Sequence, residues 1–132
     1  MMENVTVEGG SLDDLIAETM KASEAAVRAA SKDAAKKAAN DTAKKLKSTS
    51  PKRKGGYAKG WKVTFRDGGY IVHNSRFPGF TQLLEKGHDV VVNGKKVGRA
   101  KAEPHIAPAE QAGVEDFRYR IYEEVNRRLS EI

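Results

Sequence analysis

The sequence has no cysteine among its 132 residues and no run of 18 apolar residues. The first absence excludes disulfide bonds and thiolate metal sites, and it fits a reducing interior or a particle assembled in one. The second predicts that no helix spans a membrane. The opening residues lack a basic start followed by an apolar stretch, so a secretory signal is not expected.

Recognisable catalytic and metal-binding patterns are missing as well. The three histidines, His73, His88 and His105, do not stand in an H-x-x-x-H or H-E-x-x-H spacing. No G-x-S-x-G turn or phosphate-binding loop occurs, and Glu85 has no obvious second acid with which to form a carboxylate pair. We therefore expect no catalytic residue, no metal and no cofactor. A small toxin- or nuclease-like enzyme is the least favoured interpretation.

Charge is plentiful but unevenly placed, and the formal net charge is +6. Residues 1–31 carry a net charge of −4 and residues 32–62 carry +9, whereas residues 63–102 carry +4 and residues 103–132 carry −3. Two acidic ends and a basic middle can direct one surface toward nucleic acid or toward an acidic protein ring. The charge pattern does not distinguish these two partners.

Residues 11–47 are expected to form one long helix. Ser11 is a plausible N-cap, and Asp13 and Asp14 follow in the first turn, where the helix dipole favours acids. The apolar positions recur mostly every three or four residues and change from bulky to alanine-rich along the helix: Leu12, Leu15, Ile16, Met20, Val27, Ala30, Ala34, Ala38 and Leu46. An alanine face allows another element to approach closely.

A second helix is expected at residues 108–130, with Pro108 at its first position. Its apolar positions predict a buried stripe of Val114, Phe117, Ile121, Val125 and Leu129.

The middle of the chain favours short strands and turns. Residues 61–103 are expected to be β-rich, because residues 61–66 alternate in polarity and Asp67-Gly68-Gly69 and Asn93-Gly94 are hairpin turn signals. Residues 80–86 read as a short helical turn, residues 1–10 as a flexible N-terminus, and residues 48–60 as a basic loop. The expected fold is one α+β domain, in which the two helices pack on an antiparallel sheet of about three to five strands.

Basic residues gather around the end of the first helix and the loop, with Tyr57 and Trp61 between them: Lys44, Lys45, Lys47, Lys52, Arg53, Lys54 and Lys59. Lysines and arginines interleaved with aromatics are typical of nucleic-acid binding. The alternative is that the lysines are solvated and the two aromatics cap the core. A DNA-binding protein is therefore the main alternative function.

Three segments in a fixed order carry a family resemblance. SPKRKGGYAKGWKV is followed by LLEKGH at residues 83–88, and about twenty residues later by PHIAPA at residues 104–109. From Leu12 to the C-terminus, this succession resembles the gene-product-ten-like tail-component family of long-tailed bacteriophages. The intervening VVVNGKKVGRAKAE is short, so contacts made there are expected to be particular to this chain.

The motif residues are expected to specify the fold rather than to perform chemistry. We expect Leu83 and Leu84 to be buried, and Glu85 to accept backbone N–H groups or to pair with a base. The remaining motif residues have simpler roles: Gly87 permits a left-handed helix stop, His88 and His105 form hydrogen bonds, Ile106 packs inward, and Pro104 and Pro108 fix the start of the last helix.

The resemblance implies a structural virion protein of the phage neck. It implies a homo-oligomeric ring between the head-closure (stopper) protein and the tail terminator or tail tube, assembled in the host cytoplasm. It brings no catalytic residues with it. The basic residues then face either a neighbouring subunit or the packaged DNA, where contact would be non-specific.

Overall fold

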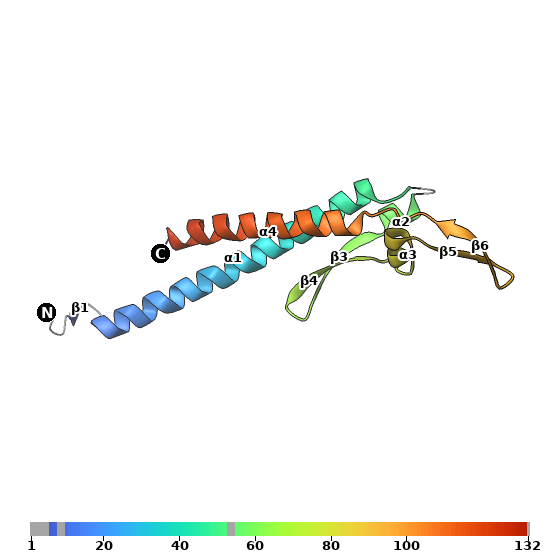
Figure 1. Ribbon diagram of the computed structural model, residues 1–132. Coiled ribbons are helices and arrows are strands. Elements are labelled where there is room, and N and C mark those ends of the chain that lie inside the picture. Colours follow the sequence, from blue (N-terminus) through green and yellow to red (C-terminus); the bar gives the residue numbers. More distant parts are fainter. Residues whose placement is uncertain (1–5, 8–9, 53–54, 132) are drawn as a thin grey trace.

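The computed structural model describes residues 6–7, 10–52 and 55–131. Two helices dominate it, α1 (Leu12–Thr49) and α4 (Ile106–Leu129), and they lie side by side in an elongated molecule (Figure 1). The remaining elements are short: β1 (Thr6–Val7), β2 (Gly10–Ser11), α2 (Gly56–Lys59), β3 (Trp61–Arg66), β4 (Gly69–Asn74), α3 (Phe80–Lys86), β5 (His88–Val92) and β6 (Lys95–Ala100). Those from β3 to β6 lie at the end of the molecule opposite the N-terminus (Figure 1).

Helix α1 confirms the prediction for residues 11–47, with slightly different limits. No glycine or proline interrupts the segment, and Asp13 occupies the first turn. The helix continues to Thr49, because the Ser50 N–H still donates to the Leu46 carbonyl at 2.9 Å and the proline that ends the pattern comes only at Pro51. The hydroxyls of Ser48 and Thr49 bond back to the Lys45 carbonyl. Within the expected flexible N-terminus, Thr6–Val7 pair with Gly10–Ser11, and residues 1–5 and 8–9 lie outside the described residues.

The α+β class is confirmed, but the arrangement of the strands differs from the expectation. In the described part of the chain the strands form three separate two-stranded hairpins, not one sheet of three to five strands. Each strand pairs with its neighbour in sequence, because tight turns at Asp67-Gly68 and Asn93-Gly94 return the chain at once. All four turn residues have positive φ, between 51° and 78°, as such turns require.

The two long helices pack through the alanine half of α1, as its small side chains predict. Six residues of α1 are buried in the half that α4 and the short elements cover: Ala30, Ala34, Ala38, Ala39, Ala43 and Leu46. The helices approach closely at Gly113 of α4, where a methyl group would come within 2.5 Å of Thr42 Oγ1. Small residues on both helices therefore set the distance between them.

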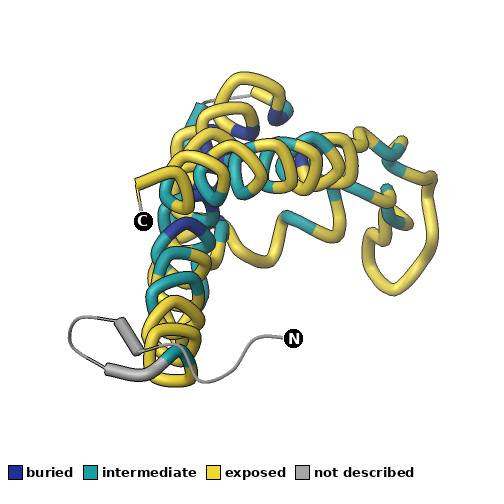
Figure 2. The backbone as a smooth tube through the Cα atoms, turned by 90° about the vertical axis from the view of Figure 1, so that its left-hand side faces the viewer, coloured by how far each residue is buried: buried dark blue, intermediate teal, exposed yellow. Residues whose placement is uncertain are grey.

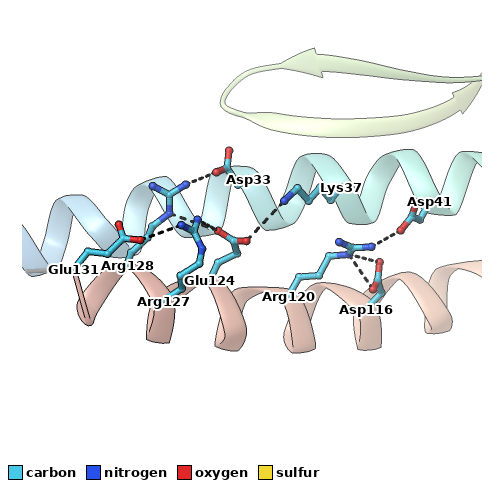
Figure 3. Close-up of polar contacts among 9 residues, drawn as sticks. All are labelled: Asp33, Lys37, Asp41, Asp116, Arg120, Glu124, Arg127, Arg128 and Glu131. Atoms are coloured by element: carbon cyan, nitrogen blue, oxygen red, sulfur yellow. Dashed lines mark hydrogen bonds and ion pairs between the residues drawn. The ribbon is translucent and has the colours of Figure 1, made fainter.

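Three ion pairs fix the register between α1 and α4, and they are spaced one helical turn apart (Figure 3): Asp33 with Arg128, Lys37 with Glu124, and Asp41 with Arg120. The sign of the charge alternates along each helix, so only this antiparallel register pairs every member. Each pair joins a half-buried side chain of α4 to a more exposed side chain of α1. Pairs that still reach solvent stabilise a fold by about 0–1 kcal/mol each, and so they specify the register more than they add stability.

A small core lies where the end of α1 meets the short elements. Leu46, Tyr57, Trp61 and Ala109 form it, and the Trp61 indole N–H donates to Ser50 Oγ at 2.8 Å. This corrects the expectation that residues 48–60 form a loop throughout. Gly56–Lys59 make one helical turn, whose Tyr57 side chain supplies the apolar surface that orders the segment.

Other parts of the apolar stripes are less buried than expected. On α4, Val114 and Leu129 are exposed, and Phe117, Ile121 and Val125 are only half-buried. On α1, Leu15, Ile16, Met20 and Val27 are exposed and Leu12 is half-buried, so that the helix is mostly yellow near the N-terminus in Figure 2. The physical reason is that α4 ends at Leu129, next to the Arg128 that pairs with Asp33, and no described helix covers the first turns of α1.

Candidate functional site

Glu85, in the last turn of α3, caps the N-terminus of α4. Its Oε1 accepts the backbone N–H groups of His105 and Ile106, both at 2.8 Å, and its Oε2 accepts that of Ala107 at 2.9 Å. The first N–H groups of a helix have no partner within the helix, and the helix dipole favours a negative charge there. The prediction that Glu85 accepts backbone N–H groups is therefore confirmed, and LLEKGH and PHIAPA meet in space.

The electrostatics of Glu85 follow from this position. Burial by itself would raise the pKa of its carboxyl group. The three backbone N–H donors and the nearby His105 ring outweigh burial and hold the pKa below its ordinary value. The carboxylate is thus the form that the fold stabilises.

His105 connects the cap to the small core. Its Nδ1 lies 2.8 Å from the Glu103 carbonyl oxygen and 3.1 Å from Glu85 Oε1, and its Nε2 lies 2.7 Å from the Tyr57 hydroxyl. Because a carbonyl oxygen only accepts, we assign a proton to Nδ1, and Nε2 then accepts from Tyr57. The predicted hydrogen-bonding role of His105 is confirmed.

Tyr57 completes the network from the side of α2. Its ring meets those of Trp61 and His105 edge-on, with centroids 5.7 and 5.5 Å apart. Burial, assisted by the negative charge of Glu85, raises the pKa of Tyr57 to about 12. The network of Glu85, His105 and Tyr57 therefore holds α2, α3 and α4 together as one rigid unit.

The glycine and prolines of the motifs also act on the backbone. Gly87 has φ 73° and ψ 174°, a conformation that essentially only glycine adopts. It ends α3 as predicted, but its ψ is extended and not that of the left-handed helical region. A methyl group there would lie 2.5 Å from the Ala100 carbonyl oxygen. Pro108 stands third in α4 instead of first, still within the first turn, where its missing N–H costs nothing. Pro104 is exposed just before the helix.

Two motif residues differ from their expected roles. Leu84 packs against the small core and is half-buried, whereas Leu83 on the same helix is 43 % exposed. A helix of only two turns has one face against the core, so adjacent leucines cannot both point inward. His88 Nδ1 is buried without a hydrogen-bond partner among the described groups, while Ile106 packs against the core as predicted.

An apolar groove of about 710 Å³ opens beside this network. Phe77 and Phe80 stack on each other in it, with ring centroids 5.1 Å apart, and they are 40 % and 47 % exposed. The groove is lined by Pro51, Gly55, Gly56, Tyr57, Phe77, Phe80, Leu83, Leu84, His88, Ala100, Lys101 and Glu103. Exposed stacked aromatics rimmed by charged residues are typical of an interaction surface. Sequence reasoning missed this groove, although the FPGF segment was a signal for it.

The predicted basic cluster is only partly a continuous surface. Lys44 and Lys47 line a shallow pocket between α1 and β3, whereas Lys45, Lys52 and Lys59 are exposed but do not line it. Arg53 and Lys54 lie outside the described residues. Tyr57 and Trp61 are 7 % and 3 % exposed, so their rings cap the core and do not present a face for stacking on bases.

Within residues 6–7, 10–52 and 55–131, no group of three histidine, cysteine, aspartate or glutamate side chains is arranged to hold a metal ion. Over the same described residues, no helix combines the length and the apolar character needed to cross a membrane.

Comparison with known proteins identifies the family. The family model described as "Bacteriophage HK97-gp10, putative tail-component" matches residues 13–96, which run from the first turn of α1 into β6. No curated protein and no solved structure matches the chain. The matched segment is more than half of the sequence and includes the LLEKGH motif. The chain therefore belongs to the HK97 gp10-like family of bacteriophage tail components.

Proposed function

We propose that this phage tail component works in the neck, as one copy of a closed ring between the head-closure protein and the tail terminator or tail tube. The observation that carries the proposal is the exposed N-terminal half of α1. Ile16, Met20 and Val27 are 49, 67 and 41 % exposed along one face. Large apolar side chains gathered on one exposed face are typical of an interaction site, so this face favours a protein partner.

The shape of the molecule supports a ring over a simple dimer. The exposed half of α1 lies at one end, and α3, whose Leu83 and Leu84 line the apolar groove, lies toward the other (Figure 1). Head-to-tail assembly requires two different surfaces on each copy, and such an interface closes into a ring when the rotation between copies allows it. Two unlike apolar surfaces at opposite ends meet the first requirement.

We also propose that the protein has no enzymatic activity. The ionisable side chains of the motif network are engaged in folding: Glu85 caps α4, and His105 is bonded to Tyr57 and Glu103. A catalytic acid or base needs a lone pair or proton that faces a substrate. In this network the carboxylate of Glu85 and both ring nitrogens of His105 are bonded to other parts of the protein.

Contact with packaged DNA is the second candidate function. Lys44, Lys47 and Lys62 line the shallow pocket between α1 and β3, and their charges suit a phosphate backbone. Binding of this kind weakens steeply as salt rises, whereas a ring interface with an apolar core does not. Titration of the purified protein with duplex DNA at two salt concentrations distinguishes the two.

The neck role is tested by infection with a phage whose gene for this protein carries a nonsense codon. Electron microscopy of the lysate is expected to show DNA-filled heads and finished tails that remain separate. Suppression of the codon should restore joined particles. Intact virions, or filled heads without any finished tails, would contradict the proposal.

A further inference from the structure

We infer that the exposed N-terminal arm of α1, residues 12–28, of one copy binds in the apolar groove beside α3 of a second copy. The inference deepens the proposed ring and rests on it, because it names the two surfaces through which neighbouring copies join. The occupant of the groove is thus a segment of the same sequence.

The arm has the features of a helix made to be covered. Leu12, Ile16, Met20 and Val27 are spaced so that they continue the face on which Ala30 and Ala34 contact α4. Seventeen residues of helix extend about 25 Å at about 1.5 Å per residue. An isolated helix of this length is marginally stable in water, so burial of its apolar face stabilises the helix itself.

The groove has the features of a receptor for such a helix. Phe77, Phe80 and Leu83 offer exposed apolar surface, and Tyr57 and Leu84 form part of its lining. Apolar grooves commonly bind amphipathic helices through side chains spaced three, four and seven residues apart. The floor is rigid, because the cap of Glu85 on α4 fixes α3 in place, and a preorganised receptor loses less entropy on binding.

The charges of the two surfaces are complementary. The arm carries four acids and two bases, with Asp13 and Glu18 exposed near its start. Lys101 lines the groove, and three further exposed lysines stand on the segments that form it: Lys52, Lys59 and Lys86. Glu103 is the acid among the lining residues. Opposite charges on the arm and at the rim of the groove favour binding of the arm there and speed the encounter of two copies.

Pairing of two arms with each other is the competing arrangement. It would cover the apolar face of α1 but would leave Phe77 and Phe80 in water on both copies. Binding of the arm in the groove covers both surfaces with one repeated contact, which is what a closed ring requires.

The absence of cysteine allows a direct test, because introduced thiols are the only ones in the chain. Phage are made with the double variant Met20→Cys/Leu83→Cys, and virions are treated with a short bis-maleimide. A linker tolerates small differences in register that a direct disulfide does not. Both positions are exposed, so folding should be preserved. The matched control, Met20→Cys/Arg66→Cys, places the second thiol at the exposed last residue of β3.

The expected result is a ladder of covalent dimers, trimers and higher multimers from the Met20/Leu83 pair and not from the control. Dimers formed by the single variant Met20→Cys would show pairing of arms and overturn the inference. Absence of cross-links in virions that contain a ring of this protein would also overturn it, while leaving the proposed function intact. Virions without such a ring contradict the proposed function itself.

A second variant measures the strength of the contact. Met20→Asp places a charge in the apolar face of the arm and should weaken self-association about tenfold or more, as expected for an anchor at the centre of an interface. Lys21→Asp, on the polar side of the same helix, should change self-association much less. Sedimentation of the purified full-length protein provides the measurement, and equal effects of the two substitutions would contradict the inference.

Discussion

The carboxylate of Glu85 lies 2.8 Å from the backbone nitrogen of His105, so that a side chain at the end of α3 completes the first turn of α4. This contact joins two sequence motifs that stand about twenty residues apart. Between them the chain forms the β5–β6 hairpin and returns. The number of residues between the two motifs is therefore set by the length of that hairpin. The Glu85 cap joins the segments on either side of the hairpin.

Removal of the cap should destabilise the protein. We expect Glu85→Ala to lower the free energy of unfolding by about 1–3 kcal/mol, because three helix N–H groups lose a charged acceptor. Chemical denaturation at neutral pH measures the change, with Glu110→Ala as a control on the exposed face of α4. Equal stabilities of the two variants would contradict the capping role.

The same contact predicts a dependence on pH. The folded state lowers the pKa of Glu85 below the ordinary value of 4.5, so its contribution is complete above that pH and is lost as the pH falls through the folded value. The stability difference between wild type and Glu85→Gln should therefore be greatest at neutral pH and should shrink in acid. A difference that grows in acid would refute this sign.

Tyr57 should make the protein sensitive to alkali. Its pKa is raised from 10.0 to about 12, so the unfolded chain releases the proton first and stability falls as the pH rises from 10 toward 12. The loss is about 2–3 kcal/mol once both states are ionised. Tyr57→Phe should be less stable at neutral pH, where it leaves His105 Nε2 unpaired, and the gap to wild type should narrow in alkali. Parallel denaturation curves across this range would exclude the assignment.

Gly87→Ala should be strongly destabilising. The positive φ with extended ψ costs a non-glycine residue about 1–3 kcal/mol, and the added methyl group would also press on the backbone at Ala100. Gly98→Ala is the matched control, since open space surrounds that position. A thermal midpoint for Gly87→Ala close to that of the control would show that the end of α3 rearranges freely.

Substitution of Leu84 should lower stability, whereas substitution of Leu83 should weaken self-association. Leu84→Ala should destabilise the fold by about 2 kcal/mol, at the low end for a buried leucine, because Leu84 is only half-buried against the core. Leu83→Ala should leave the thermal midpoint almost unchanged and weaken self-association instead, since Leu83 faces the groove. The reverse pattern, measured by calorimetry and sedimentation, would contradict the assignment of the two faces.

Much of the local structure was predictable because it depends on neighbours in sequence. Asp67-Gly68 and Asn93-Gly94 specify tight turns through residues that tolerate positive φ, and both hairpins form as predicted. The presence of the two long helices follows in the same way from their periodicity, whereas each of their limits differs from the expected one by one or two residues. The acceptor role of Glu85 was predictable from its residue type, but the identity of its donors was not.

The features that depend on long-range placement were not predictable. The sequence does not say how far along α1 the end of α4 reaches, so it did not reveal that the bulky half of α1 remains uncovered. The groove arises from Phe77, Phe80 and Leu83, whose neighbours come from distant segments. The register of the two helices could have been predicted in part. Asp33, Lys37 and Asp41 alternate in charge, and their partners on α4 alternate with the opposite signs.

Electron cryomicroscopy of the intact head–tail junction can show whether this tail component forms a ring in the neck. We expect a closed ring of identical copies between the head-closure layer and the tail, with residues 12–28 of each α1 against Phe77 and Phe80 of its neighbour. A junction that lacks this chain, or a virion in which the chain lies only at another part of the tail, would refute the proposed ring.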